Sequence, residues 1–183
     1  MQTLSVSPTT HPLSPLAAEQ IKAFLQETVG EWHSQRRYYT LDKGVVQEVE
    51  SLLSVRFLEA GSELLQELAG LHGLASDAPI SCGTQVTWES TYPNTSRKPA
   101  VGSTIFGEYQ GLLLRDRGFA TPKPVTATYT FPSDRTLCLR TEYKGSKFEE
   151  EVKLIGTQYR TRQSIISRAG QEIMIGQYLE KRI

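Results

Sequence analysis

A helix that ends at a glycine and runs at once into a tryptophan-containing strand constrains this fold more than any other feature. Ser14-Pro15 provides an N-cap residue and a proline at the first helical position. Ile21, Phe24 and Leu25 then recur at helical spacing. The chain continues as Gly30-Glu31-Trp32, and the glycine ends the helix. We therefore predict an N-terminal helix that leads directly into the first β-strand.

This first strand combines an aromatic and a cationic side chain on one face. Every second side chain of a strand points the same way, so Trp32, Ser34 and Arg36 share a face with Tyr38 and Thr40. A guanidinium beside an indole indicates that the interior is not simply a hydrocarbon core. The pattern predicts a cavity for a ligand that has an aromatic body and an acidic group.

Most of the remaining chain is predicted to be strand. A second short helix is expected over Ser62–His72, where four leucines form an apolar stripe before Gly73. Short turn signals such as Lys144-Gly145 and Ala169-Gly170 favour an antiparallel barrel or sandwich, mainly β, with nine to ten strands. The opening helix and Gly-x-Trp strand are typical of lipocalin-type up-and-down barrels. The expected strands are 31–41, 46–58, 80–92, 103–115, 124–131, 135–143, 146–156, 158–168 and 171–181.

Length and charge narrow the class of protein. The chain has 183 residues, which predicts one barrel domain, 16–183, behind a flexible Pro/Ser/Thr-rich extension, 1–15. Twenty basic and twenty acidic residues cancel, so neither nucleic acid nor an acidic membrane is an expected partner. The longest apolar runs fall well short of the roughly 20 residues that span a bilayer.

Catalytic residues of the familiar kinds are not apparent. Cys82 and Cys138 lack metal-ligand spacing, and both are predicted to be reduced, half-buried thiols in a cytosol-like compartment. The histidines suggest neither a metal site nor a catalytic triad, and the sequence contains no phosphate-binding loop.

Three arginines lie on predicted strands: Arg36, Arg160 and Arg162, the last two on one face with Ser164. The planar guanidinium binds a carboxylate through two parallel hydrogen bonds, so these residues suit a ligand with carboxylate arms. Two alternatives remain open. The arginines could be solvated on the outside, or Arg36 could pack against the Trp32 indole and close the base of the barrel.

The two tryptophans are candidate ligand contacts. Trp88 lies in the middle of a strand and is the better candidate for stacking on a ligand, whereas Trp32 could be purely structural. Glu89 should point outward if Trp88 points inward.

Three motifs together resemble the S-type phycobiliprotein lyases, the CpcS/CpeS family. They are Gly30-x-Trp32-x-Ser34-Gln35-Arg36, Trp88-Glu89 and Arg160-Thr161-Arg162-Gln163-Ser164, and the resemblance covers about residues 16–183. It implies a ten-stranded barrel, like a lipocalin or a fatty-acid-binding protein, that binds an open-chain bilin. Such lyases attach the bilin through a thioether to a cysteine of an apo-phycobiliprotein. This sequence departs from many relatives in having Arg37-Tyr38-Tyr39 where histidine is expected.

The resemblance gives the candidate residues their roles. Arg36, Arg160 and Arg162 would pair with the bilin propionates, and Trp88 and the tyrosines would stack on its rings. Ser164 and Trp32 are further candidate ligand contacts. An acid that protonates the bilin would assist thiol addition, and Glu89, Glu108 and Glu172 are the candidates. The substrate would be phycocyanobilin or a related bilin, with no permanently bound cofactor, in a cyanobacterial cytosol or a plastid stroma.

Two other functions remain as alternatives. The chain could be a non-catalytic, lipocalin-like carrier of a bilin or another apolar carboxylate. It could also be a structural barrel whose interior is filled by its own side chains. The sequence leaves open whether the protein works alone, as a homodimer or with a paralogue.

Overall fold

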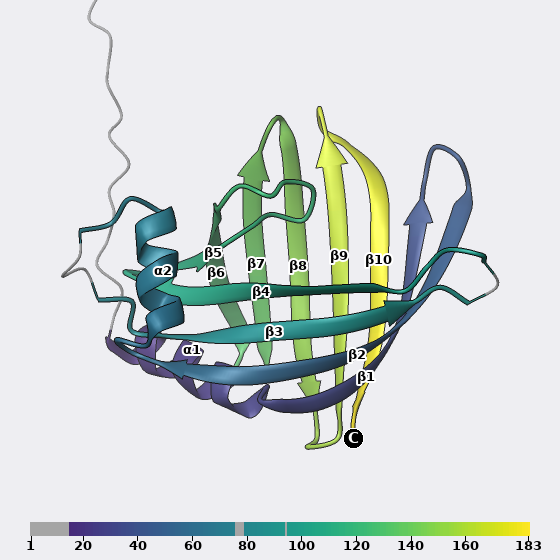
Figure 1. Cartoon of the computed structure of the whole chain (residues 1–183). Helices are drawn as coiled ribbons and strands as arrows, with labels where there is room; N and C mark the ends of the chain where they lie inside the picture. Colours follow the sequence, from purple (N-terminus) through teal and green to yellow (C-terminus); the bar gives the residue numbers. More distant parts are fainter. Residues whose placement is uncertain (1–14, 76–78, 94) are drawn as a thin grey trace, which may run out of the picture.

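Within the described residues, 15–75, 79–93 and 95–183, the computed structural model has ten antiparallel strands closed into a barrel and two helices (Figure 1). Each strand pairs with its neighbours in sequence, and β1 pairs with β10 to close the barrel. This confirms the predicted up-and-down barrel with an N-terminal helix and a short second helix. The elements are α1 (Pro15–Glu27), β1 (Gly30–Thr40), β2 (Val45–Glu59), α2 (Glu63–Leu71), β3 (Cys82–Thr91), β4 (Ala100–Tyr109), β5 (Leu112–Arg115), β6 (Val125–Ser133), β7 (Thr136–Tyr143), β8 (Ser146–Ile155), β9 (Tyr159–Arg168) and β10 (Gln171–Arg182).

One predicted strand, 103–115, is wrong because it is two strands. A two-residue turn at Gln110-Gly111 separates β4 from β5, and both residues have positive φ, 47° and 85°. Positive φ at both central residues is what a type I′ hairpin turn requires. Tyr109 pairs with Leu112 across this turn, so the inward face changes from even-numbered residues in β4 to odd-numbered residues in β5.

The helix α1 closes one end of the barrel. Its apolar residues Ile21, Phe24 and Leu25 are buried and pack with inward side chains such as Leu113 and Leu139. The hairpin tips at the other end, including β1–β2 and β9–β10, project away from the helices at the top and right of Figure 1. The barrel therefore has a plugged end and an end that α1 leaves uncovered.

The helix α2 packs on the outside of the barrel over a pair of glycines. Gly83 and Gly107 are opposite each other in the β3–β4 register. A Cβ atom built on Gly107 would lie 2.8 Å from the Cδ2 atom of Leu68, and one on Gly83 would lie 2.7 Å from the Cδ2 atom of Leu65. The absence of side chains at these two positions lets the apolar face of α2 approach the sheet closely.

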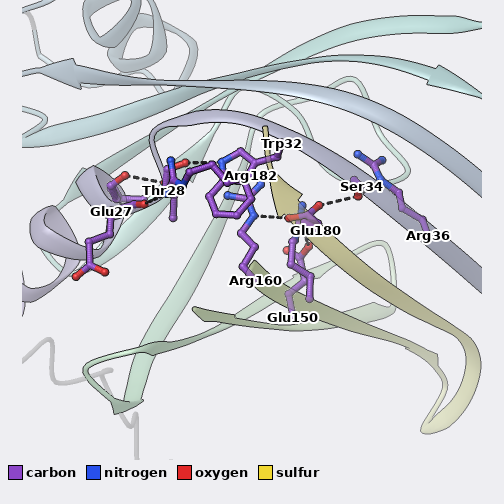
Figure 2. A network of polar contacts seen from close by, with 11 residues as sticks. Glu27, Thr28, Trp32, Ser34, Arg36, Glu150, Arg160, Glu180 and Arg182 are labelled. Atoms are coloured by element: carbon purple, nitrogen blue, oxygen red, sulfur yellow. Dashed lines mark hydrogen bonds and ion pairs between the residues drawn. The ribbon is translucent and has the colours of Figure 1, made fainter. Parts of the chain in front are cut away.

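Trp32 lies between two guanidinium groups at the base of the barrel (Figure 2). The Arg160 guanidinium carbon is 4.4 Å from the centre of the indole, and the Arg182 carbon is 4.3 Å from it. The indole nitrogen donates to the Thr28 carbonyl at 2.9 Å, and Arg182 Nη2 donates to the Glu27 carbonyl at 2.8 Å. The last strand is thus tied to the C-terminal end of α1, where helix carbonyls lack intrahelical partners.

Glu180 supplies the negative charge opposite Arg160 at the base of the barrel. It is fully buried, accepts a hydrogen bond from the Ser34 hydroxyl at 2.8 Å and forms an ion pair with Arg160. Burial by itself would raise the pKa of Glu180. The guanidinium groups of Arg160 and Arg162 and the hydrogen bonds from Arg160 and Ser34 outweigh burial, so the pKa is lowered.

The predicted extension, residues 1–15, lies outside the described residues except for Pro15, the first residue of α1. The division into an extension and a barrel domain, 16–183, stays a prediction. In the part of the chain that the structure describes, no helix has the length and apolar character needed to cross a membrane.

Replacing Gly107 by valine should destabilise the fold by about 1–3 kcal/mol, because the new side chain would overlap α2. The measurement is urea unfolding followed by circular dichroism. Gly70→Ala is the control, since nothing lies within 4 Å of a Cβ at this exposed position in α2. It should stabilise by about 0.5–1 kcal/mol through helix propensity. A Gly107→Val protein as stable as wild type would contradict the packing described here.

Replacing Glu180 by glutamine should destabilise the protein by about 3–5 kcal/mol at neutral pH, because Arg160 would stay buried without a counter-charge. The lowered pKa means that the stabilisation by the carboxylate is present above the ordinary glutamate value of 4.5. It is lost as pH falls through the folded-state value. Unfolding free energies of wild type and variant should therefore converge in acid. Glu151→Gln, at an exposed position, should change stability by less than about 0.5 kcal/mol. A gap that stayed constant into acid would refute the assignment.

Candidate functional site

The barrel encloses a cavity of about 640 Å³. This volume falls within the range of about 300–1,000 Å³ that is usual for small-molecule sites. Inward side chains of β1–β5 and β8–β10 line it, together with the segments that follow β3 and β5. The lining includes Arg36, Tyr38, Val49, Val86, Trp88, Tyr92, Arg97, Phe106, Arg115, Arg117, Phe119, Glu150, Arg162, Met174 and Tyr178.

A carboxylate lies between two arginines in the cavity wall. Glu150 accepts from Arg162 Nη2 at 3.3 Å through one oxygen and from Arg115 Nη1 at 3.4 Å through the other. The Glu150 side chain is only 10% exposed. Burial would lower the pKa of Arg162, but the negative charges of Glu180 and Glu150 outweigh it and the pKa is raised. The three residues form a charged cluster, hereafter the Arg–Glu–Arg cluster.

The ring of Tyr178 lies between two guanidinium groups in the same wall. It is opposite Arg36 of β1 and Arg162 of β9 in the strand register, and their guanidinium carbons lie 5.6 and 5.0 Å from its ring centre. Arg36 Nε also donates to the Ser34 hydroxyl at 3.1 Å. Burial and the neighbouring Tyr38 raise the pKa of Tyr178 above its ordinary value. The phenol therefore remains protonated at neutral pH.

Trp88 supplies a flat apolar surface to the cavity. Gly102 is its register partner on β4, and a Cβ atom at Gly102 would overlap the Cζ2 atom of the indole. The glycine makes room for the indole in the wall, where Trp88 stays half-buried and borders the cavity.

Positive charge exceeds negative charge in the cavity lining. Five arginines border it, against one carboxylate, Glu150. Arg117 is paired with Asp116 outside the cavity at 3.2 Å. The Nε atom of Arg115 is buried and has no hydrogen-bond partner among the described residues. Such a lining suits a ligand that brings its own carboxylates to the guanidinium groups.

The structure separates the predicted ligand contacts into two groups. Arg36, Trp88 and Arg162 line the cavity, as expected. Arg160 and Trp32 belong to the base below it, where the guanidinium packs on the indole. The alternative that an arginine closes the base is thus correct for Arg160, whereas Arg36 was the arginine expected there.

Ser164 does not line the cavity itself but lies beside it. It is buried, 3.5 Å from the Tyr178 hydroxyl, and lines a small adjoining hollow with Glu150 and Arg115.

The predicted acids do not line the cavity. Glu89 is exposed on the outer face, as its alternation with Trp88 requires, and Glu172 is exposed near the bulge at the start of β10. Glu108 points inward but lies at the plugged end, where it accepts from the Gly111 backbone at 2.9 Å and from Ser81. These positions do not support the predicted contact of the three carboxylates with a ligand in the cavity.

Sequence reasoning missed Glu150 and Arg115. Glu150 shares the inward face of β8 with Phe148 and Val152, so a carboxylate among apolar residues at every second position was the available signal. Arg115 was hidden because the segment 103–115 was interpreted as one strand. That interpretation places Arg115 on the face opposite Phe106, whereas the turn at Gln110-Gly111 brings both inward.

The thiols lie outside the cavity lining. Cys82 is buried in the apolar cluster beside α1, and Cys138 is half-buried on β7. Burial raises the pKa of both thiols, which reduces the fraction of reactive thiolate. Among the described residues, histidine, cysteine and carboxylate side chains form no cluster that could hold a metal ion.

Two known proteins are similar in sequence to this chain over most of its length. A Nostoc sp. (strain PCC 7120) protein named "Putative phycocyanobilin lyase CpcS 2" is 60% identical over 164 residues, covering 90% of this chain and 91% of its own. A Picosynechococcus sp. (strain PCC 7002) protein named "Putative chromophore lyase CpcV" is 50% identical over 162 residues, covering 88% and 80%.

A solved structure shares the fold. The S-type phycobiliprotein lyase CPES from Guillardia theta superposes with a TM-score of 0.74 at 22% identity, covering 93% of this chain and 98% of its own. The sequence profile of the family described as CpeS-like protein matches residues 20–183. The Gly-x-Trp opening, the closed ten-stranded barrel and this match lead to one conclusion: the chain belongs to the CpeS-like family of S-type phycobiliprotein lyases.

Proposed function

We propose that this chain is a chromophore lyase that binds an open-chain bilin in the barrel cavity and attaches it to a cysteine of an apo-phycobiliprotein. The observation that carries the proposal is the Arg–Glu–Arg cluster, which lies in the wall of a 640 Å³ cavity that Trp88 also borders. The 60% identical relative named as a phycocyanobilin lyase supports phycocyanobilin as the first substrate to test.

The chemistry of a bilin matches the wall of this cavity. Its two propionates would pair with guanidinium groups of Arg36, Arg115 and Arg162, since each guanidinium offers two parallel donors to a carboxylate. Its pyrrole N–H groups would donate to Glu150, and its conjugated rings would stack on Trp88. A propionate that reaches Arg115 or Arg162 competes with Glu150 for the same donors, which frees the carboxylate for the pyrroles.

The lyase does not need a nucleophile of its own. The thiol of the acceptor protein adds across the exocyclic ethylidene double bond of the bilin: a C–S bond forms, the proton goes to the bilin, and nothing is released. The cavity would hold the bilin so that this carbon faces the incoming thiol, which converts a bimolecular encounter into an oriented one. Glu150, which borders the cavity, takes the place of the acids predicted from the sequence.

The remaining expectations are part of the same proposal. The bilin would be bound as a substrate, without a permanently bound cofactor, and the acceptor subunit would be the protein partner. The two free cysteines support a reducing compartment such as a cytosol or stroma. All residues that line the cavity come from one chain, and the protein would act as a homodimer or with a paralogue without changing this site.

The proposal is tested by mixing the purified protein with phycocyanobilin and an apo-phycocyanin β subunit, then measuring acid-urea-stable adduct by visible absorbance. Bilin affinity is measured separately by absorbance titration. Arg36→Ala and Arg162→Ala should each weaken bilin binding about tenfold or more, since a hydrogen bond to a charged group contributes about 1.5–3 kcal/mol. Arg37→Ala, the outward neighbour on β1 with a 62% exposed side chain, is the matched control and should bind as wild type.

The outcomes separate the candidate functions. Adduct that forms faster and more cleanly with the protein than without it supports a lyase. Bilin binding without accelerated attachment would demote the protein to a carrier. No bilin binding at all would contradict both functions.

A further inference from the structure

The segments around the open end of the barrel carry an excess of basic side chains. We call these segments the mouth rim: 41–44, 92–93 with 95–99, 116–124, 144–145 and 169–170, which join the strands at the end that α1 does not cover. Six exposed basic residues lie on the rim: Lys43, Arg97, Lys98, Arg117, Lys123 and Lys144. Its acidic residues are Asp42 and Asp116, so the rim is positive although the whole chain is neutral.

Most of this positive charge is not neutralised within the barrel. Asp116 is already engaged, since it accepts from the Thr104 hydroxyl at 2.6 Å and pairs with Arg117 at 3.2 Å. Across residues 15–75, 79–93 and 95–183, no ion pair includes Lys43, Lys98, Lys123 or Lys144. These lysines are available to a partner.

The segment around α2, on the outside of the barrel, does not share this charge. Residues 57–75, which include α2, contain Glu59, Glu63 and Glu67 and no lysine or arginine. The mouth rim is therefore positive where this segment is negative, and the rim charge can act on whatever approaches the cavity.

Apolar side chains are exposed on the rim and directly beside it. Leu41 and Phe119 on the rim are 44% and 42% exposed, and Val45 and Val46 at the adjoining start of β2 are 54% and 50% exposed. An apolar centre surrounded by polar residues is the usual composition of a protein–protein interface. A small dianion passing into the cavity would need only the charges.

The position of the cavity determines which surface meets the acceptor protein. The helix α1 fills the other end with Ile21, Phe24 and Leu25, so a thiol carried by a protein can reach the bilin only through the mouth. We infer that the mouth rim is the docking surface for the acceptor subunit and that this subunit presents an acidic patch with apolar residues around its acceptor cysteine. The inference rests on the proposed lyase function.

Charge complementarity of this kind acts mainly on the rate of encounter. Opposite potentials on two surfaces raise association rates by factors of about 10–1,000, and the effect falls as ionic strength rises. Attachment should therefore be faster at low salt, whereas bilin bound inside the cavity depends on the Arg–Glu–Arg cluster and not on the rim lysines.

The experiment compares two triple charge reversals. The rim variant carries Lys98→Glu, Lys123→Glu and Lys144→Glu, and the control carries Arg56→Glu, Lys153→Glu and Lys181→Glu on exposed outer strand positions. Both change the net charge equally. Bilin affinity is measured by absorbance titration, and adduct formation on the apo-phycocyanin β subunit is measured at low and high salt.

The expected result is that the rim variant binds bilin as wild type does but forms adduct about tenfold or more slowly at low salt, with the difference closing at high salt. The control should match wild type. An equal loss in both variants, no loss in the rim variant, or a loss explained by weaker bilin binding would overturn the inference. If wild type binds bilin but forms no adduct, the proposed lyase function fails and the docking inference falls with it.

Discussion

The buried ion pair between Arg160 and Glu180 is the interaction on which the rest of the barrel depends. It joins β9 to β10, and the Ser34 hydroxyl extends it to β1, so it spans the seam where the first and last strands close the barrel. The Arg160 guanidinium packs on the Trp32 indole. The indole N–H donates to the Thr28 carbonyl at the C-terminal end of α1. A charged pair inside a barrel is costly to desolvate, but it fixes one arrangement of these four elements.

This base allows the upper part of the barrel to remain hollow. The guanidinium groups below have partners, because Arg160 pairs with Glu180 and Arg182 donates to backbone carbonyls. Above them the balance fails, since Arg115 and Arg162 share the carboxylate of Glu150, and no ion pair among the described residues includes Arg36. The barrel thus stabilises itself at one end and leaves unsatisfied guanidinium donors at the other, where a ligand with carboxylates can use them.

Period-two alternation made much of this predictable. It placed Arg36 and Tyr38 on the inward face with Trp32, and it placed Trp88 inward with Glu89 outward, as observed. Alternation gives the face of a residue but not its depth along the barrel axis. Arg160 and Arg162 therefore looked equivalent in the sequence, although one belongs to the base and the other to the cavity.

Two further positions were hard to interpret for equally local reasons. Arg115 was lost because a two-residue turn reverses which residues point inward, and a glutamine–glycine pair is a weaker turn signal than asparagine–glycine. Glu108 faces inward as a ligand contact would, yet a backbone N–H of that same turn occupies its carboxylate. The pattern of apolar and polar residues predicts neither the turn at Gln110-Gly111 nor its hydrogen bond to Glu108.

The pairing of β1 with β10 has a consequence for how this protein associates with others. Each of the ten strands has a hydrogen-bonded neighbour on both sides, and β1 and β10, which would be the edges of an open sheet, pair with each other. Among the described residues, the edge that another strand could extend is confined to the stretch where the short β5 does not cover β4 and β6, since β4 pairs with β5 only from Phe106 to Tyr109. Elsewhere on the barrel, recognition must be carried by side chains. A surface of that kind can change its partner through a few substitutions on its loops while the backbone that supports them stays the same.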